Sequence, residues 1–116
     1  MKILLSMLIV LGTVQVHAGA LSEEAYQTQL KKSYDRLQQQ ELQLKQAMQA
    51  SQHHLEVIEK ACNYAKTLHG IRQLSSSNRH LTQAQAELTM VNELNRNINY
   101  SFRTLGTSYG QSCQSV

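Results

Sequence analysis

Apolar side chains recur at steps of three, four or seven residues along two long stretches of the chain. The first stretch contains Leu30, Tyr34, Leu37, Leu44, Met48, Leu55, Ile58, Cys62 and Ala65. The second contains Leu81, Ala84, Leu88, Val91, Ile98, Phe102 and Leu105. This spacing places every member of a stretch on one side of an α-helix. The pattern predicts an all-α protein built from two long amphipathic helices.

Capping residues define where these helices begin and end. Ser22 is a suitable N-cap, and Glu23 and Glu24 follow it in the first turn, where acidic side chains favour the helix dipole. Gly70 and Gly106 are suitable for helix C-termini because glycine accepts a left-handed backbone. The predicted elements are a helix over 22–69, a turn over 70–77 and a helix over 78–105.

Two such helices form an antiparallel hairpin if their apolar seams face each other. The register that we prefer places Asn95 level with Ser51 and Leu88 level with Ile58. The two polar side chains then face each other inside the apolar seam. A single buried asparagine commonly fixes the register of paired helices. We therefore expect Ser51 and Asn95 to set the alignment.

This alignment leaves the beginning of the first helix without an intramolecular partner. Leu30, Tyr34 and Leu37 extend beyond the second helix and form an apolar stripe. Exposed apolar stripes commonly mark binding surfaces. The three residues are thus predicted to bind a protein partner or a second copy of the chain.

The segment before Ser22 has the layout of a secretory signal peptide. Lys2 precedes an apolar run, and small residues suitable for cleavage follow at Ala18 and Ala20. We expect a signal peptide over 1–18, with cleavage after Ala20 as the alternative, and a soluble protein in the periplasm. The membrane would then be involved only during export.

Export into an oxidising compartment favours a disulfide between Cys62 and Cys113. In the preferred register, however, Cys113 would have to return about 31 Å to reach Cys62. The tail after Leu105, within residues 107–116, spans at most about 26–29 Å. We favour a shortened second helix, while a slipped register or a three-helix bundle, with a break near Ser51, would also close the bond. Disulfides between two chains are the remaining alternative.

Composition argues against several functional classes. Charged residues make up 16% of the chain and the formal charge is +3. This positive charge is too small to indicate binding to nucleic acid. The adjacent His53 and His54 point about 100° apart on a helix and cannot chelate a metal well. Because no catalytic motif is present either, we expect neither an enzyme nor a bound metal or cofactor.

The segment LTQAQ, Leu81 to Gln85, matches the LTxxQ pattern of periplasmic chaperones of the Spy/CpxP type. Those proteins are exported, all-helical and dimeric. The resemblance covers five residues, of which three are fixed, and it implies a holdase chaperone or inhibitor.

A second resemblance involves the first helix, which contains YQTQLKKSYDRLQQQELQLKQAMQ after the signal peptide. It is similar to the long Gln/Leu-rich helices of small periplasmic proteins encoded with type IV secretion and conjugation machines. This likeness implies an accessory component of such an apparatus that binds partners through the first helix. A small secreted toxin is a third hypothesis.

Overall fold

The computed structural model describes residues 20–50 and 53–114, most of which belong to three long helices. The helices are α2 at Glu23–Gln49, α3 at His54–Ser76, α4 at Thr82–Thr104 and the short α5 at Tyr109–Ser112. Neither described range contains a β-strand. The predicted all-α class is confirmed.

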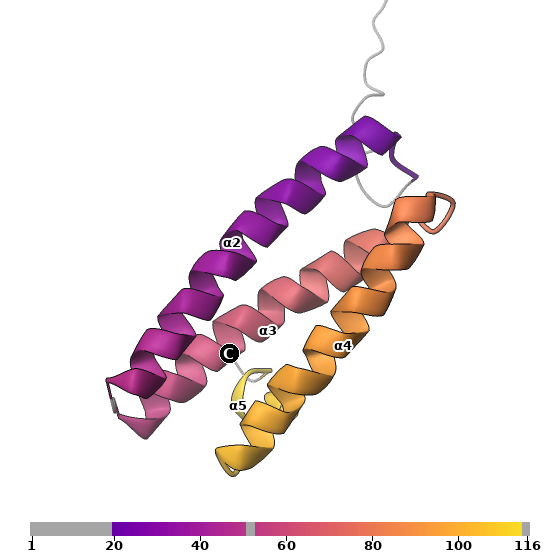
Figure 1. Ribbon diagram of the computed structural model, residues 1–116. Helices are drawn as coiled ribbons and strands as arrows, with labels where there is room; N and C mark the ends of the chain where they lie inside the picture. The colour runs from indigo at the N-terminus through magenta and orange to yellow at the C-terminus, as the bar shows by residue number, and fades with distance from the viewer. Residues whose placement is uncertain (1–19, 51–52, 115–116) are drawn as a thin grey trace, which may run out of the picture.

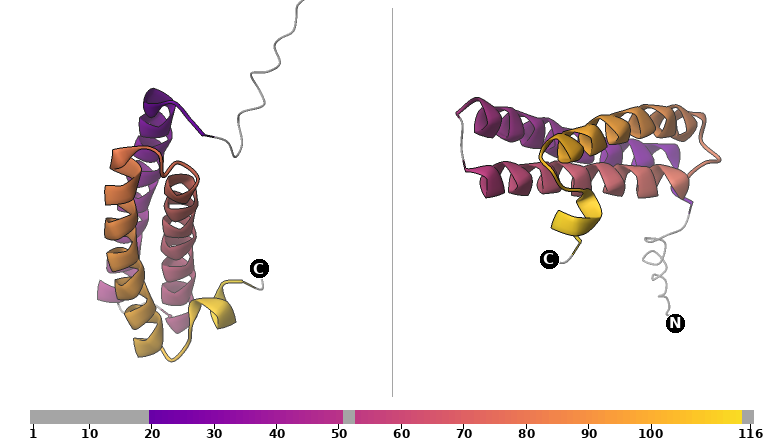
Figure 2. Two further views of the ribbon diagram at one scale, coloured as in Figure 1. Left: turned by 90° about the vertical axis from the view of Figure 1, so that its right-hand side faces the viewer. Right: turned by 90° about the horizontal axis from the view of Figure 1, so that it is seen from below.

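The three long helices form a bundle in which the chain runs down, up and down again in the view of Figure 1. α3 packs against both α2 and α4, which run in the same direction as each other (Figure 2). The core consists of residues from all three helices and the tail: Tyr26, Leu30, Leu37, Ala61, Cys62, Tyr64, Ala65, Leu68, Ile71, Ala84, Val91, Ile98, Phe102 and Cys113.

The predicted single helix over 22–69 is wrong, because α2 ends at Gln49 and α3 begins at His54. The His53 ring caps the new helix: its Nδ1 accepts a hydrogen bond from the Leu55 amide at 3.2 Å. The three-helix alternative is therefore correct. The expectation of a shortened second helix is wrong, since α4 continues to Thr104.

Gly70 does not end a helix, although the sequence predicted that it would. α3 continues through Gly70 to Ser76, and its next turns bury Ile71 and Ser75 completely. Burial of these residues outweighs the modest cost of a glycine within a helix, about 1 kcal/mol. Two other predicted ends are confirmed: the Ser22 hydroxyl caps α2, and Gly106 has a φ of 80° just after α4.

Polar side chains connect the start of α2 to the turn between α3 and α4. The buried Asn78 accepts a hydrogen bond from the Leu21 amide at 2.7 Å and donates one to the Leu74 carbonyl at 2.7 Å. Asn78 does not cap α4, because Leu81 occupies the N-cap position. This end of the bundle is consequently closed by specific hydrogen bonds.

Candidate functional site

The apolar stripe predicted to bind a partner lies inside the bundle. Leu30 and Leu37 are each 5% exposed and belong to the core, and Tyr34 is half-buried against it. The prediction that these residues lack an intramolecular partner is wrong. The physical reason is the break after Gln49, which folds α3 back along α2 and buries the stripe within the chain.

Side chains bridge α2 and α4 over the first half of their shared length. Gln27 donates a hydrogen bond to Gln83 at 3.0 Å. The Tyr34 hydroxyl donates one to a Glu87 carboxylate oxygen at 2.6 Å. Both bonds join α2 to the first turns of α4. They therefore close the space between α2 and α4 near the α3–α4 turn.

The second half of the α2–α4 space is open and apolar, and we call it the α2–α4 groove. Two adjoining hollows, each of about 220 Å³, make up this groove. Leu44, Met48 and Ser101 line both hollows. The remaining lining residues are Glu41, Lys45, Ala61, Tyr64, Asn97, Ile98, Tyr100, Thr104 and Leu105. Ala61, Tyr64 and Ile98 are buried residues of the core, so the groove opens directly onto the bundle interior.

Large apolar side chains remain exposed along the edges of the groove. Met48 on α2 is 56% exposed and Tyr100 on α4 is 65% exposed. The Arg103 guanidinium lies 5.8 Å from the centre of the Tyr100 ring. Glu41 and Lys45 form an ion pair at 3.6 Å on the α2 edge. Such an apolar floor with a charged and aromatic edge has the composition of a protein-binding surface.

Two tyrosines beside the groove keep their protons well above neutral pH. Burial raises the pKa of Tyr34, and its hydrogen bond to the Glu87 carboxylate raises this pKa further. Burial also raises the pKa of Tyr64, with the negative charge of Glu41 as the second cause. Their hydroxyls therefore act as neutral hydrogen-bonding groups rather than as charges.

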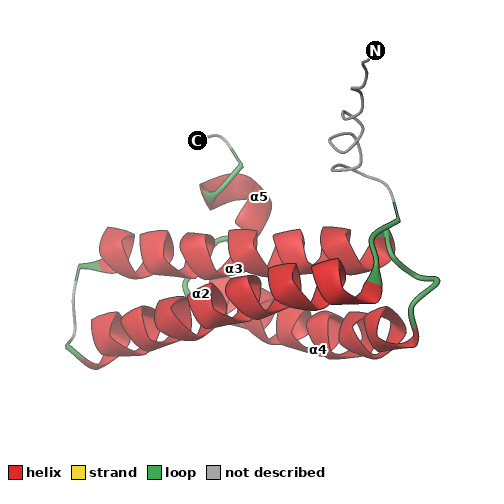
Figure 3. Cartoon of the chain, turned by 90° about the horizontal axis from the view of Figure 1, so that it is seen from above, coloured by secondary structure: helices red, strands yellow, loops and turns green. Residues whose placement is uncertain are grey.

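The predicted disulfide forms within the chain, between Cys62 and Cys113. It fastens α5 to α3 (Figure 3). The Tyr109 ring helps to hold the tail, with its centre 4.6 Å from that of His69 and 6.3 Å from that of Phe102. α3 continues to Ser76 and α4 begins only at Thr82, and this later turn shifts the register of the two helices so that Cys113 reaches Cys62 without any shortening of α4.

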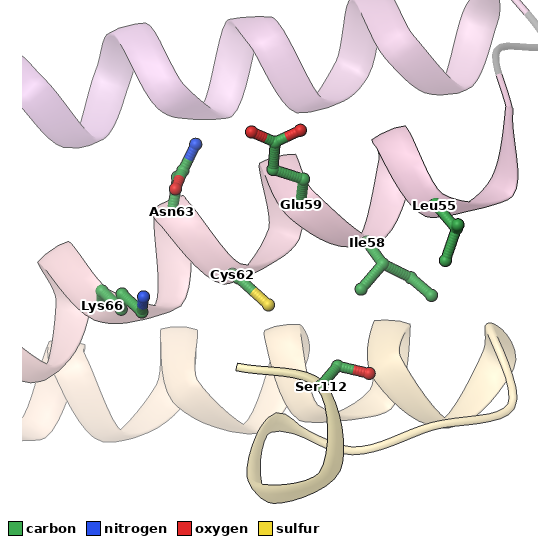
Figure 4. A pocket seen from close by; sticks show the side chains of 7 residues that line it. All are labelled: Leu55, Ile58, Glu59, Cys62, Asn63, Lys66 and Ser112. Carbon is green, nitrogen blue, oxygen red and sulfur yellow. The ribbon is translucent and has the colours of Figure 1, made fainter. Parts of the chain in front are cut away.

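A separate hollow, of about 360 Å³, lies beside the disulfide. Its lining residues are Leu55, Ile58, Glu59, Cys62, Asn63, Lys66 and Ser112. In Figure 4, Ile58 and Cys62 point from α3 toward α5, whereas Glu59 and Asn63 point away from it. Cys62 provides no free thiol for chemistry here because its sulfur is bonded to Cys113.

The predicted register of the two helices is wrong at its described positions, Ile58 and Leu88, because Ile58 lies near the start of α3 and Leu88 near the α3–α4 turn. Ser51 lies outside the described residues, but α4 runs antiparallel to α3 from the turn that joins them. Tyr64 and Ile98 consequently share one hollow, far from the predicted pairing of Ile58 with Leu88. The Asn95 Oδ1 atom is buried and has no hydrogen-bond partner among the residues that the structure describes.

The histidines and the LTQAQ segment have local structural contacts. His80 approaches the Leu21 carbonyl at 3.3 Å, and His69 packs on Tyr109. Leu81 precedes α4 as its N-cap, and the Gln85 side chain donates a hydrogen bond to the Arg79 carbonyl at 3.0 Å. Across residues 20–50 and 53–114, no group of three or more metal-ligating side chains comes together.

Sequence reasoning missed the α2–α4 groove. Leu44, Met48 and Leu105 were recognised as seam residues, but a continuous helix would place them in a different pairing. Tyr100 is not one of the periodic seam residues. Its exposed place at the groove is evident only in the folded chain. The preferred prediction lacked the helix break that follows Gln49. No glycine or proline marks this break in the sequence.

Comparison with known proteins adds no relative: no protein-family model, curated protein or solved structure matches the chain. Of the helices in the described part of the chain, none is long and apolar enough to cross a membrane. The groove geometry is therefore the basis for a functional proposal.

Proposed function

We propose that this chain is an exported, non-enzymatic binding protein that holds a protein partner in the α2–α4 groove. The observation that supports the proposal best is the placement of exposed Met48 and Tyr100 beside an apolar hollow. Exposed apolar side chains that converge on a concave surface are typical of binding sites. The partner would cover these side chains.

The proposed location is an oxidising compartment, the periplasm. The Cys62–Cys113 disulfide supports export, because such bonds persist in oxidising environments. The predicted signal peptide lies outside the described residues. Within this setting, the similarity of the first helix to proteins of type IV secretion and conjugation machines supports an accessory role in such an apparatus.

A matched pair of substitutions tests the groove. Met48→Lys places a charge at the groove edge, whereas Leu42→Lys makes the same change elsewhere on α2. Both parent side chains are 56% exposed, but Leu42 lies with Asp35, Gln38 and Gln39 on a polar surface.

The tagged variants would be produced in cells that lack the natural gene, and their bound proteins would be quantified by mass spectrometry. Met48→Lys should lose the partner at least tenfold, while Leu42→Lys should retain it. Restoration of secretion or conjugation would be measured in the same cells. Equal partner recovery with both variants would refute the groove as the binding site.

A holdase chaperone remains the alternative function. It predicts that equimolar protein suppresses the aggregation of an unrelated denatured client. The Met48→Lys variant should suppress this aggregation less than the Leu42→Lys variant does. Failure to suppress aggregation would remove this alternative without affecting the proposal of a specific partner.

A further inference from the structure

We infer that the occupant of the α2–α4 groove is an amphipathic α-helix of another protein, lying antiparallel to α2 and α4. This inference rests on the proposed function and specifies the chemistry of the partner. The groove lies between α2 and α4 and has α3 residues at its floor. Both of these helices run against α3 (Figures 1 and 2). A helix placed there completes an up-down-up-down four-helix arrangement.

The walls of the groove favour a helix over an extended segment. Both walls are α-helices, whose backbone N–H and C=O groups are bonded within the helix. The walls consequently offer no free strand edge for an extended peptide to pair with. An occupant has to satisfy its own backbone hydrogen bonds, and a helix does so internally.

The length of the groove sets the number of anchoring side chains. On α2 the lining extends from Glu41 to Met48, about 10 Å at 1.5 Å per residue. Beyond that stretch, the Tyr34–Glu87 hydrogen bond closes the space. Two helical turns therefore fit, and they present two large apolar side chains spaced three or four residues apart, one for each hollow.

Helix dipoles determine the direction of the occupant. The C-termini of α2 and α4 lie at the open end of the groove, together with the N-terminus of α3. Two negative ends and one positive end leave an excess of negative partial charge there. Arg103 offsets part of it, while the last turn of α2 has no basic residue. The positive N-terminus of an incoming helix complements this end.

A second copy of the chain cannot supply such a helix from its described residues. The apolar faces of its long helices are buried in its own core. Its exposed large apolar side chains are Leu42, Met48, Leu55, Met90 and Tyr100. None of these residues lies three or four positions from another on the same helix, so no pair of anchors is available.

Photo-crosslinking in the cells that naturally produce the protein tests the inference. The photoreactive residue p-benzoylphenylalanine would be placed at position 41 or 48 in the groove, with position 42 as the control. All three positions are exposed, so the fold should tolerate the change, and circular dichroism would verify this. Crosslinked residues in the partner would be mapped by peptide mass spectrometry.

The expected result is that positions 41 and 48 capture one segment of one protein, at points about seven residues apart, with the position-48 contact nearer its N-terminus. Contacts about three residues apart would indicate an extended segment and overturn the inference. The reverse order, or capture of a second copy of this chain, would also overturn it. If positions 41 and 48 capture nothing beyond the position-42 control, both the inference and the proposed function fail.

Discussion

The Tyr26 hydroxyl lies 2.7 Å from the Ser75 hydroxyl in the bundle core, where both residues are fully buried. This hydrogen bond joins the first turn of α2 to the last turn of α3. It satisfies two polar groups that would otherwise be costly to bury. It also requires α3 to continue beyond Gly70, because a helix that ended there would not bring Ser75 to Tyr26.

Removing one hydroxyl of this pair should therefore destabilise the fold. Tyr26→Phe is expected to lower the free energy of unfolding by about 1–3 kcal/mol, because the Ser75 hydroxyl is left buried and unpaired. Urea unfolding followed by circular dichroism measures the change. The double variant with Ser75→Ala should cost less than the sum of the single variants. Strict additivity would show that the two hydroxyls do not interact.

The stripe on α2 provides a second test of the fold. Leu37→Ala should lower the free energy of unfolding by about 2–5 kcal/mol, because Leu37 is a buried core residue. Leu42→Ala, on the same helix but 56% exposed, should change it by less than about 0.5 kcal/mol. Similar small effects at both positions would support a free stripe and contradict the three-helix bundle.

Reduction tests the intramolecular disulfide. The purified protein should migrate as a monomer on a non-reducing gel, and its mass should increase by two hydrogen atoms after reduction. Cys113→Ser is expected to cost about 2–5 kcal/mol of unfolding free energy, since the bond closes a loop with a sequence separation of 51. Cys62→Ser should have the same effect. A dimer that reductant dissociates would show bonding between chains.

The tyrosines predict a loss of stability in alkali. The pKa values of Tyr26, Tyr34 and Tyr64 are raised in the folded chain above the ordinary value of 10.0, mainly by burial. Above that pH the unfolded chain loses protons that the folded chain keeps. Unfolding free energy should thus be constant below the ordinary pKa and fall above it, by up to about 1.4 kcal/mol per pH unit for each tyrosine.

Tyr34→Phe isolates one contribution to this alkaline loss. The variant should show a shallower decline of unfolding free energy than the parent chain between about pH 10 and 11. Urea unfolding at each pH, with the disulfide kept oxidised, measures the slope. An unchanged slope would show that Tyr34 ionises equally readily in the folded and unfolded chains.

Much of the helical content could be predicted from local signals, because periodic apolar residues and caps act within a few turns. Ser22 and Gly106 mark their helix ends correctly in the structure. The break between Gln49 and His54 could not be favoured in the same way, since the apolar seam continues across it. What determines the break is long-range burial of Leu30 and Leu37 against α3, which helix periodicity does not encode.

The candidate site depends on that same long-range folding. The cysteine pair was predictable because only two cysteines are present and an oxidising compartment was expected. The residues that line the groove could not be predicted in this way. The assignment of Leu30, Tyr34 and Leu37 as partner-binding residues assumed a single long helix. Met48 and Tyr100 approach one groove only after α2 and α4 have both packed on α3.

The position of Cys113 in the chain gives its bond with Cys62 a role in timing. Cys113 follows all three long helices in chain order, so the disulfide forms only after each of them has been synthesised. A product truncated before Cys113 retains Cys62 as a free thiol. The oxidation state of Cys62 thus shows whether synthesis continued past the third long helix to Cys113. A thiol-reactive dye can distinguish molecules that contain Cys113 from molecules truncated before it.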